Sequence, residues 1–285
     1  MKQYVRFSKN ETIYYGIIEN SKIHHISSTP FKKYDLTSEI SSFSEVDILP
    51  PLVPGKIICI GLNYRDHLNH IGEKPEPKHP EPFLFTPSAI IAHNSSIILP
   101  EGATQVEEEA ELVVIMGKTC KNVSAKNAKD YIFGYINFID VSARGVEPNG
   151  GSSFFWGKSW DTFAPIGPAI VTADEIDDPQ NLNVNLWVNG VARQNMNTSD
   201  MGRSVGEVVE FATWLITMKP GDMISTGTNH VGLGPIQDGD KIEMQIDKLG
   251  PKLHVDVKDE WKRTWPRQPL SEMTAFESSV RSKIK

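Results

Sequence analysis

The stretch that decides the fold reads Val106-Glu107-Glu108-Glu109-Ala110-Glu111-Leu112-Val113-Val114-Ile115-Met116-Gly117. Its second half has the pattern of a buried strand, whereas its first half is acidic. Because the side chains of a strand alternate between its two faces, Glu109 and Glu111 lie on the same face. Beyond Leu112 both faces are apolar, which is typical of a strand that is covered on both sides.

Two carboxylates at the entrance of such a strand would lie close together with little water around them. Like charges repel, and the burial of each charge is costly. A divalent cation removes both costs, and oxygen ligands favour Mg²⁺, Mn²⁺ or Ca²⁺. The alternative is an edge strand whose glutamates are solvated, and this segment alone leaves both interpretations open.

The composition is that of an ordinary globular protein, since 39% of the 285 residues are hydrophobic and 23% are charged. The formal net charge of -7 argues against nucleic acid as a partner, because phosphate binding needs a basic patch. No apolar run approaches the length of a membrane-spanning helix, and the first seven residues lack the apolar core of a signal peptide. Cys59 and Cys120 indicate neither a disulfide framework nor a thiolate zinc site. We therefore expect a cytoplasmic enzyme that binds neither nucleic acid nor membrane.

A proline-rich segment, Leu49-Pro50-Pro51-Leu52-Val53-Pro54-Gly55, divides the chain. Its prolines make it stiff and extended, so we expect a small N-terminal domain over residues 1–50 and a larger domain over residues 51–285. The smaller domain contains short strand-like runs at Tyr4–Phe7, Ile13–Ile18 and Ile23–Ile26.

Capping and turn residues place three elements in the larger domain. Ser124 is a candidate cap for a helix that runs through Phe133. Asn189-Gly190 lies between alternating runs and predicts a β-hairpin. Ser204 and Glu207 form a capping box ahead of a helical apolar stripe. Predicted strands outnumber predicted helices, so we expect a mainly β protein with some α-helix.

Polar residues outside the acidic segment are further candidates for chemistry. Asp140 follows an apolar strand and would complete a metal site, although a turn-capping aspartate is the alternative. Lys158 stands between aromatic residues and either extends to the surface or is a desolvated cation. His67 is either a base or a surface histidine. The loop that contains Thr228 is glycine-rich, but it lacks the Gly-Lys-Ser/Thr ending of a phosphate loop.

Six motifs follow one another along the chain: Asn63-Tyr64-Arg65-Asp66-His67, Glu109-Ala110-Glu111-Leu112, Asp140-Val141-Ser142-Ala143-Arg144, Gly157-Lys158-Ser159-Trp160-Asp161-Thr162-Phe163, Pro165-Ile166-Gly167-Pro168 and Thr226-Gly227-Thr228. Together and in this order, they closely resemble the fumarylacetoacetate hydrolase family, in its acylpyruvase-like or 2-hydroxyhepta-2,4-diene-1,7-dioate isomerase-like branch. The resemblance runs from about Pro54 to Arg267 and implies a mixed β-roll, mainly β with peripheral helices, after a small N-terminal α/β domain. It also implies a homodimer.

The resemblance assigns roles to the charged residues near the acidic segment. It implies that Glu109, Glu111 and Asp140 hold Mg²⁺, or Mn²⁺ or Ca²⁺ in its place. The metal would chelate the oxygens of a 2-oxo acid or β-diketone substrate. Arg144 and Lys158 match the family's anion and oxyanion partners, and Lys158 is the catalytic candidate of the two.

Other matched positions concern the substrate and water. Thr228 matches the threonine that binds the substrate carboxylate, and we place Tyr64 with it among the substrate-binding residues. His67 matches the histidine of a lid segment, which in hydrolases helps to activate water. Many hydrolases have a glutamate where His70 stands and a glutamine where Glu147 stands. We keep His70 as a catalytic candidate and Glu147 as a substrate-binding candidate, but the missing His–Glu pair puts hydrolysis in doubt.

The sequence thus predicts a Mg²⁺-dependent hydrolase that cleaves a C–C bond in an acylpyruvate-like or 2,4-dioxo acid. A metal and an ammonium group would stabilise the enolate that this cleavage expels. Within the family, the alternative is a decarboxylase of the oxaloacetate type, or an isomerase or tautomerase of a 2-oxo or 2-hydroxydienoic acid. A metal-binding module without catalysis is the alternative of another class.

Overall fold

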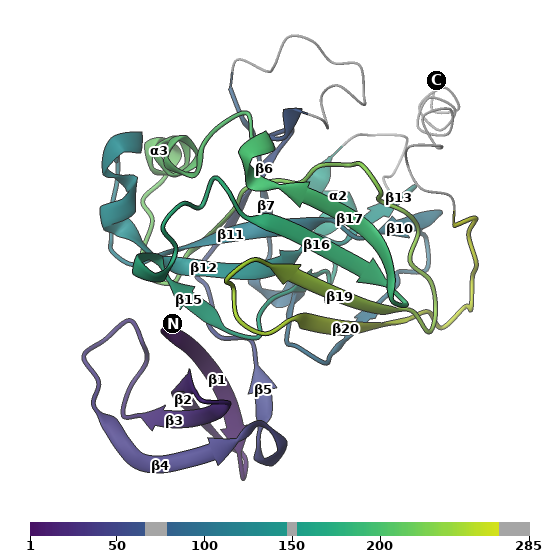
Figure 1. Ribbon diagram of the computed structural model, residues 1–285. Helices are drawn as coiled ribbons and strands as arrows, with labels where there is room; N and C mark the ends of the chain where they lie inside the picture. The colour runs from purple at the N-terminus through teal and green to yellow at the C-terminus, as the bar shows by residue number, and fades with distance from the viewer. Residues whose placement is uncertain (66–78, 147–152, 268–285) are drawn as a thin grey trace.

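The computed structural model describes residues 1–65, 79–146 and 153–267 and is mainly β over these ranges (Figure 1). The N-terminal strands are β1 (Gln3–Lys9), β2 (Thr12–Glu19), β3 (Lys22–Ile26), β4 (Leu36–Ser42) and β5 (Asp47–Leu49). The later strands are β6 (Ile57–Gly61), β7 (Glu81–Phe85), β8 (Ile90–Ile91), β9 (Ser96–Ile98), β10 (Gln105–Glu107), β11 (Ala110–Met116), β12 (Ile132–Ile139), β13 (Ser142–Arg144), β14 (Ala164–Pro165), β15 (Ile170–Thr172), β16 (Asn183–Val188), β17 (Val191–Asn197), β18 (Met223–Ser225), β19 (Lys241–Ile246) and β20 (Leu253–Lys258). The α-helices of the described part are α2 (Phe154–Lys158) and α3 (Val205–Leu215), and its 3-10 helices are η1 (Phe43–Glu45), η2 (Pro87–Ala89), η3 (Ala125–Tyr131), η5 (Ala173–Glu175) and η6 (Thr198–Asp200).

One mixed sheet runs through both parts of the chain. Over the described residues it has eleven strands in the order β4-β3-β2-β1-β15-β12-β11-β18-β6-β7, with β5 paired to β1. A five-stranded sheet, in the order β17-β16-β19-β20-β9, accompanies it, and β10–β13 and β14–β8 form two short pairs. Strand β11 is thus an interior strand between β12 and β18, as the apolar pattern on both of its faces predicts. The expected mainly β fold is confirmed.

The N-terminal domain contains strands where the α/β expectation also required α-helix. The three predicted strand-like runs fall in β1, β2 and β3, which Figure 1 shows as a lobe in purple at the start of the chain. The serine-rich stretch forms β4 and the short η1, so over residues 1–50 the α-helical part of the expectation is wrong. The hairpin turns explain the meander, because Asn10-Glu11 and Asn20-Ser21 all have positive φ, as tight two-residue turns require.

Of the three elements predicted in the larger domain from capping and turn residues, two are present in the structure and one is not. Asn189-Gly190 joins β16 to β17 with positive φ at both residues, and Ser204 with Glu207 caps α3, so both predictions are confirmed. The helix expected from Ser124 through Phe133 is instead the 3-10 helix η3, and Phe133 already lies in β12. Strand pairing overrides the cap signal there, because β12 must reach β15.

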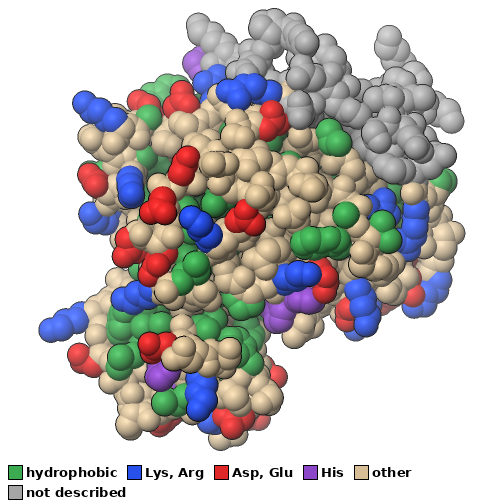
Figure 2. Space-filling view, viewed as in Figure 1, with side chains coloured by type: hydrophobic (Ala, Val, Ile, Leu, Met, Phe, Trp, Pro, Cys, Tyr) green, Lys and Arg blue, Asp and Glu red, His purple; other side chains and the backbone are tan. Residues whose placement is uncertain are grey.

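Apolar side chains from both sheets form the main core, which includes every residue of β11 that is not a carboxylate. No helix within the described ranges is long and apolar enough to cross a membrane. On the face shown in Figure 2, lysine and arginine side chains are interspersed with aspartate and glutamate.

Candidate metal centre and active site

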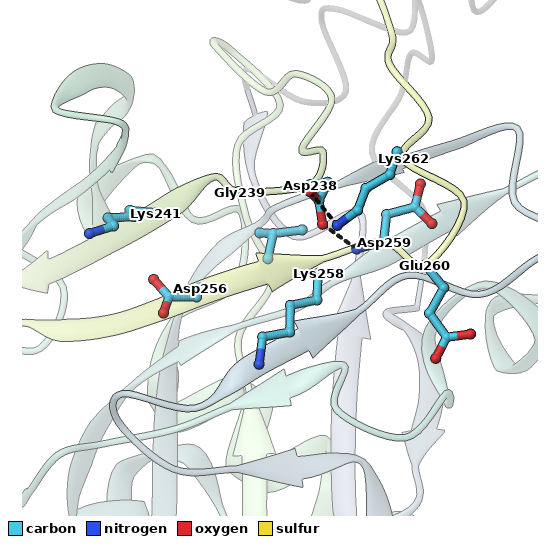
Figure 3. A pocket seen from close by; sticks show the side chains of 9 residues that line it. Asp238, Gly239, Lys241, Asp256, Lys258, Asp259, Glu260 and Lys262 are labelled. Atoms are coloured by element: carbon cyan, nitrogen blue, oxygen red, sulfur yellow. Dashed lines mark hydrogen bonds and ion pairs between the residues drawn. The ribbon is translucent and has the colours of Figure 1, made fainter.

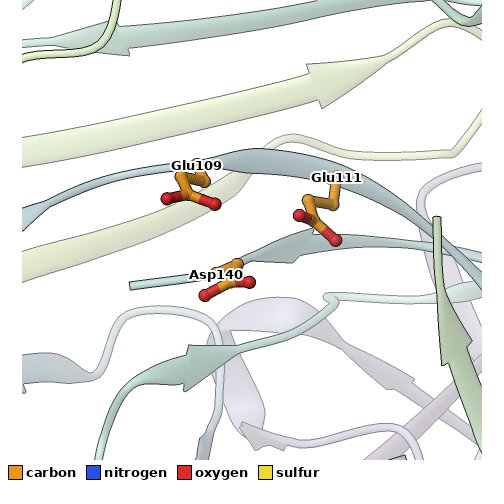
Figure 4. A group of neighbouring side chains, drawn as sticks. All are labelled: Glu109, Glu111 and Asp140. Atoms are coloured by element: carbon orange, nitrogen blue, oxygen red, sulfur yellow. The ribbon is translucent and has the colours of Figure 1, made fainter. Parts of the chain in front are cut away.

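Three carboxylates meet where β11 begins and β12 ends. Glu109 directly precedes β11, Glu111 is the second residue of that strand, and Asp140 directly follows β12. The strands are antiparallel with Ala110 opposite Ile139, so Asp140 comes to lie beside Glu109. The backbone N–H of Asp140 donates to the carbonyl oxygen of Glu109 at 2.8 Å. One carboxylate oxygen from each residue lies within 4.8 Å of the other two, and Figure 4 shows the side chains gathered in one place.

Burial separates the two interpretations of the acidic segment. Glu109 is 4% exposed, Glu111 is 2% exposed and Asp140 is fully buried. An edge strand with solvated glutamates would expose these side chains, so that alternative is wrong. The structure has instead concentrated negative charge where water cannot screen it.

Lys158 provides positive charge inside this cluster. It is the last residue of α2, and its Nζ lies 2.9 Å from Glu109 Oε2 and 2.7 Å from Asp140 Oδ2. Its side chain is 5% exposed, so the alternative of a lysine that extends to the surface is wrong. Burial opposes its charge, but Asp140, Glu109 and Glu111 outweigh this effect and raise the pKa of Lys158. The group is therefore an ammonium cation over the whole physiological pH range.

Glu111 is oriented by the last residue of β18 and by the loop that follows this strand. The hydroxyl of Ser225 and the backbone N–H of Gly227, at 3.2 Å, both donate to Glu111 Oε2. Gly227 has φ +86°, and a Cβ there would lie 2.7 Å from the carbonyl oxygen of Ile60, so only glycine fits this turn. Both donors act on the same oxygen, Oε2, so together they fix the orientation of the carboxylate.

The electrostatics of the cluster fit a bound divalent cation. Burial, reinforced by Asp140, raises the pKa of Glu111 well above its usual range, and burial raises the pKa of Asp140 to about 7 although Lys158 opposes it. Burial also disfavours charge on Glu109, but Lys158, His230 and Arg144 outweigh it and lower the pKa of Glu109 below its usual range. The three carboxylates outnumber the one lysine that lies among them, so their negative charge is not fully balanced. Their oxygens are the donors that hard divalent cations prefer.

Arg144 and Thr228 also lie at this site. Arg144 ends β13, and its Nη2 lies 3.4 Å from Glu109 Oε1. Thr228 is 4% exposed, and its hydroxyl donates at 2.8 Å to the carbonyl oxygen of Ala110. Ala110 stands between Glu109 and Glu111 in the sequence. Tyr64 is fully buried, and its pKa is raised by burial and, to a smaller extent, by the nearby charge of Glu111.

Three of the predicted residues, His67, His70 and Glu147, lie outside the described residues. One residue that the sequence prediction missed is His230, which is 8% exposed and has Nε2 at 3.8 Å from Glu109 Oε1. The backbone N–H of Val231 donates to the side chain of Asn229 at 2.7 Å, and this turn holds the loop around His230. Its position two residues after Thr228 was the available signal.

A separate surface cavity of about 480 Å³ lies along β20 and the loop before β19, and its lining includes Asp238, Lys258 and Lys262 (Figure 3). Two of its charged side chains already pair with each other: Lys262 donates to Asp238 Oδ2 at 2.8 Å, and the N–H of Asp259 donates to Asp238 Oδ1 at 2.9 Å. The backbone N–H of Asp259 and then Lys262 lower the pKa of Asp238. Asp238 and Lys262 therefore form an ion pair at the surface, in contrast to the buried cluster of carboxylates.

A mainly β chain that buries three converging carboxylates beside a lysine has the properties of a metal-dependent enzyme. Residues 56–256 match the family described as Fumarylacetoacetate (FAA) hydrolase C-terminal, and residues 2–51 match the family described as Rv2993c-like, N-terminal. The first match covers most of the chain. The protein belongs to the fumarylacetoacetate hydrolase family.

Its relatives differ in the reactions that their names state. The mitochondrial oxaloacetate tautomerase of Xenopus laevis is 39% identical over 225 residues, which are 76% of this chain and 70% of the relative. The crystal structure of 2-hydroxyhepta-2,4-diene-1,7-dioate isomerase from Mycobacterium marinum is 34% identical, with a TM-score of 0.82 over 91% of this chain and 99% of that chain. Maleylpyruvate hydrolase from Sphingobium sp. SYK-6, in complex with manganese(II) ion and pyruvate, is 30% identical, with a TM-score of 0.75 over the same shares of 91% and 99%.

Proposed function

We propose that this protein is a divalent-metal-dependent enzyme that stabilises the enolate of a 2-oxo acid, and that it isomerises or tautomerises such an acid. The observation that carries the proposal is the placement of the Lys158 ammonium between Glu109 and Asp140, at 2.9 and 2.7 Å. A metal-binding module without catalysis has no need for a buried cation that competes with the metal. An enolate-forming enzyme needs such a group, because negative charge develops on the oxo oxygen.

Glu109, Glu111 and Asp140 would hold the cation, with Mg²⁺ as the proposed metal and Mn²⁺ as a substitute. When bound, the cation would supply Lewis-acid polarisation of the substrate's oxo group. Lys158 is fixed as a cation by its carboxylate neighbours, so it donates hydrogen bonds and is not a base. Thr228 and Arg144 would bind the substrate's carboxylate, and burial of the surrounding residues would exclude water from the enolate.

Tautomerisation is favoured over hydrolysis by what each reaction requires. Once the enolate is stabilised, tautomerisation needs only a proton carrier, whereas hydrolysis also needs an activated water. The family resemblance implies that second task for His67, and three residues later this sequence has His70 where many hydrolases have glutamate.

Hydrolysis of an acylpyruvate-like or 2,4-dioxo acid, the reaction predicted first from the sequence, is the second candidate. It is supported by the likeness to a maleylpyruvate hydrolase that binds manganese and pyruvate. Its leaving group is the same enolate, so the residues described here would serve both reactions.

A substrate panel separates these reactions. Purified protein would be given oxaloacetate, an acylpyruvate and a sugar-derived 2,4-dioxo acid, with added Mg²⁺ or with EDTA, and keto–enol conversion, decarboxylation and C–C cleavage would be followed separately. We expect Mg²⁺-dependent keto–enol conversion of oxaloacetate as the fastest reaction. Faster cleavage of the acylpyruvate would favour the second candidate, and turnover that is unaffected by EDTA would contradict both.

The panel needs a matched pair of variants. Asp140→Asn removes one candidate ligand with little change in shape, and it should abolish turnover. Asp177→Asn makes the same chemical change at a side chain that is 92% exposed, and it should leave turnover unchanged.

The homodimer implied by the family belongs to the same proposal, and light scattering should give twice the chain mass of 31.8 kDa.

A further inference from the structure

Glu107 is a fourth buried carboxylate beside the metal centre, and the metal-site hypothesis gives it no role. It is the last residue of β10 and is 5% exposed. Its Oε2 accepts hydrogen bonds from Arg144 Nε at 3.0 Å and Nη2 at 2.6 Å, and its Oε1 accepts one from Gln105 Nε2 at 2.6 Å. Both oxygens therefore have strong donors.

The pairing of two short strands creates this network. Strand β10 runs antiparallel to β13, with Gln105 opposite Arg144 and Glu107 opposite Ser142. Glu107 and Glu109 are two residues apart, yet a different residue of β13 is the main donor to each. Ser142 Oγ donates to Glu109 Oε1 at 2.8 Å, whereas Arg144 directs Nε and Nη2 at Glu107 at 3.0 and 2.6 Å and reaches Glu109 Oε1 only at 3.4 Å.

Arg144 lies between a carboxylate that belongs to the metal centre and one that does not. Its Nη2 is 2.6 Å from Glu107 Oε2 and 3.4 Å from Glu109 Oε1. A guanidinium group paired fully with Glu109 would compete with a cation for that carboxylate. The shorter distance shows that Arg144 binds Glu107 more strongly than it binds Glu109. The second hydrogen bond to Glu107, through Nε, fixes the plane of the guanidinium.

We propose that Glu107 is a positioning residue, which holds Arg144 away from Glu109 and thereby keeps Glu109 available as a metal ligand. This inference rests on the proposed metal-dependent function. Gln105 has a supporting role, because its side chain donates to Glu107 and so orients the carboxylate that holds Arg144. Groups that orient metal ligands without touching the metal commonly change metal affinity by about 10- to 100-fold when they are altered.

Calorimetric titration of the metal-free full chain with Mn²⁺ tests the proposal. Glu107→Asp keeps the charge but shortens the side chain, so its carboxylate no longer reaches both donors. We expect it to weaken Mn²⁺ binding by about tenfold or more, and Glu107→Gln to do the same. Asp177→Asn, at an exposed site, is the matched control and should bind as the wild type does. Wild-type affinity in Glu107→Asp would overturn the proposal.

The second measurement separates positioning from net charge and from misfolding. The Arg144→Gln variant has no guanidinium that Glu107 must keep away from Glu109. Adding Glu107→Gln to this variant should therefore change the Mn²⁺ affinity by less than about threefold. An equal loss in both backgrounds would mean that Glu107 acts only through its charge or through folding, and would overturn the proposal. If the wild type itself binds no Mn²⁺, the proposed function fails first, which is a different result from binding without coupling.

Discussion

Replacing Lys158 by methionine tests the link between the buried ammonium and catalysis. Methionine fills a similar space without a charge or a donor. Loss of one donor to a developing oxyanion costs roughly 10²- to 10³-fold in kcat. Since Lys158 Nζ lies within 2.9 Å of two carboxylates, its removal also leaves buried charges without their partner, which costs about 3–5 kcal/mol in comparable proteins. The second effect should appear only without metal, because a bound cation would replace the lost charge.

The assay therefore has two parts. With saturating Mg²⁺ and the best substrate of the panel, we expect kcat to fall by about a hundredfold or more while KM changes less. With EDTA at pH 8, thermal unfolding should occur at a clearly lower temperature than in the wild type, and Mg²⁺ should restore most of the difference. If kcat is unchanged while the EDTA-treated variant is destabilised, Lys158 only balances charge, and its catalytic role is refuted.

Three further predictions concern the same site. Glu111→Ala should keep the fold but lose Mn²⁺ binding in calorimetry, because it removes one of three charged ligands; retained wild-type affinity would remove Glu111 from the metal centre. In EDTA, stability should fall as pH rises from 5 to 8, because folding raises the pKa of Asp140 from its ordinary 3.8 to about 7 and the folded state then binds more protons than the unfolded state. Urea unfolding at both pH values measures this fall, which Asp140→Asn should reduce, and an equal fall in that variant would contradict the assignment. We also expect His230, whose Nε2 lies 3.8 Å from Glu109 Oε1, to donate a hydrogen bond to the carboxylate of a bound 2-oxo acid. His230→Ala should then raise KM for that acid by roughly tenfold, whereas His230→Gln, which retains a donor, should raise KM less. Equal KM values in both variants and the wild type would place His230 outside the substrate site.

The strand that crosses the core was predictable because its pattern is local. The apolar run after Glu111 predicts an interior strand, and β11 is one. The hairpin at Asn189-Gly190 and the cap at Ser204 were predictable for the same reason, since their signals lie within a few residues. The cap signal at Ser124 failed because the pairing of β12 with β15, a long-range interaction, decided that segment.

The candidate site was predictable in its residues and unpredictable in its contacts. Asp140 was a candidate because it follows an apolar strand and matches a metal-binding aspartate of the family, and the register of β11 against β12 then places it beside Glu109. The burial of Lys158 depends on how α2 packs, which no local pattern encodes. His230 and the Glu107–Arg144 pair come from a loop and from two short strands, whose positions depend on the completed fold.

The central claim is that this site stabilises the enolate of a 2-oxo acid with the help of a divalent metal. Its most direct test is the exchange of C3 hydrogens of a 2-oxo acid for deuterium in D₂O, followed by NMR, because exchange reports enolate formation whatever reaction follows. We predict rapid exchange with wild-type protein and Mg²⁺, and loss of exchange with EDTA or in Asp140→Asn. Exchange that persists in EDTA and in Asp140→Asn, or no exchange with any 2-oxo acid of the panel, would contradict the claim.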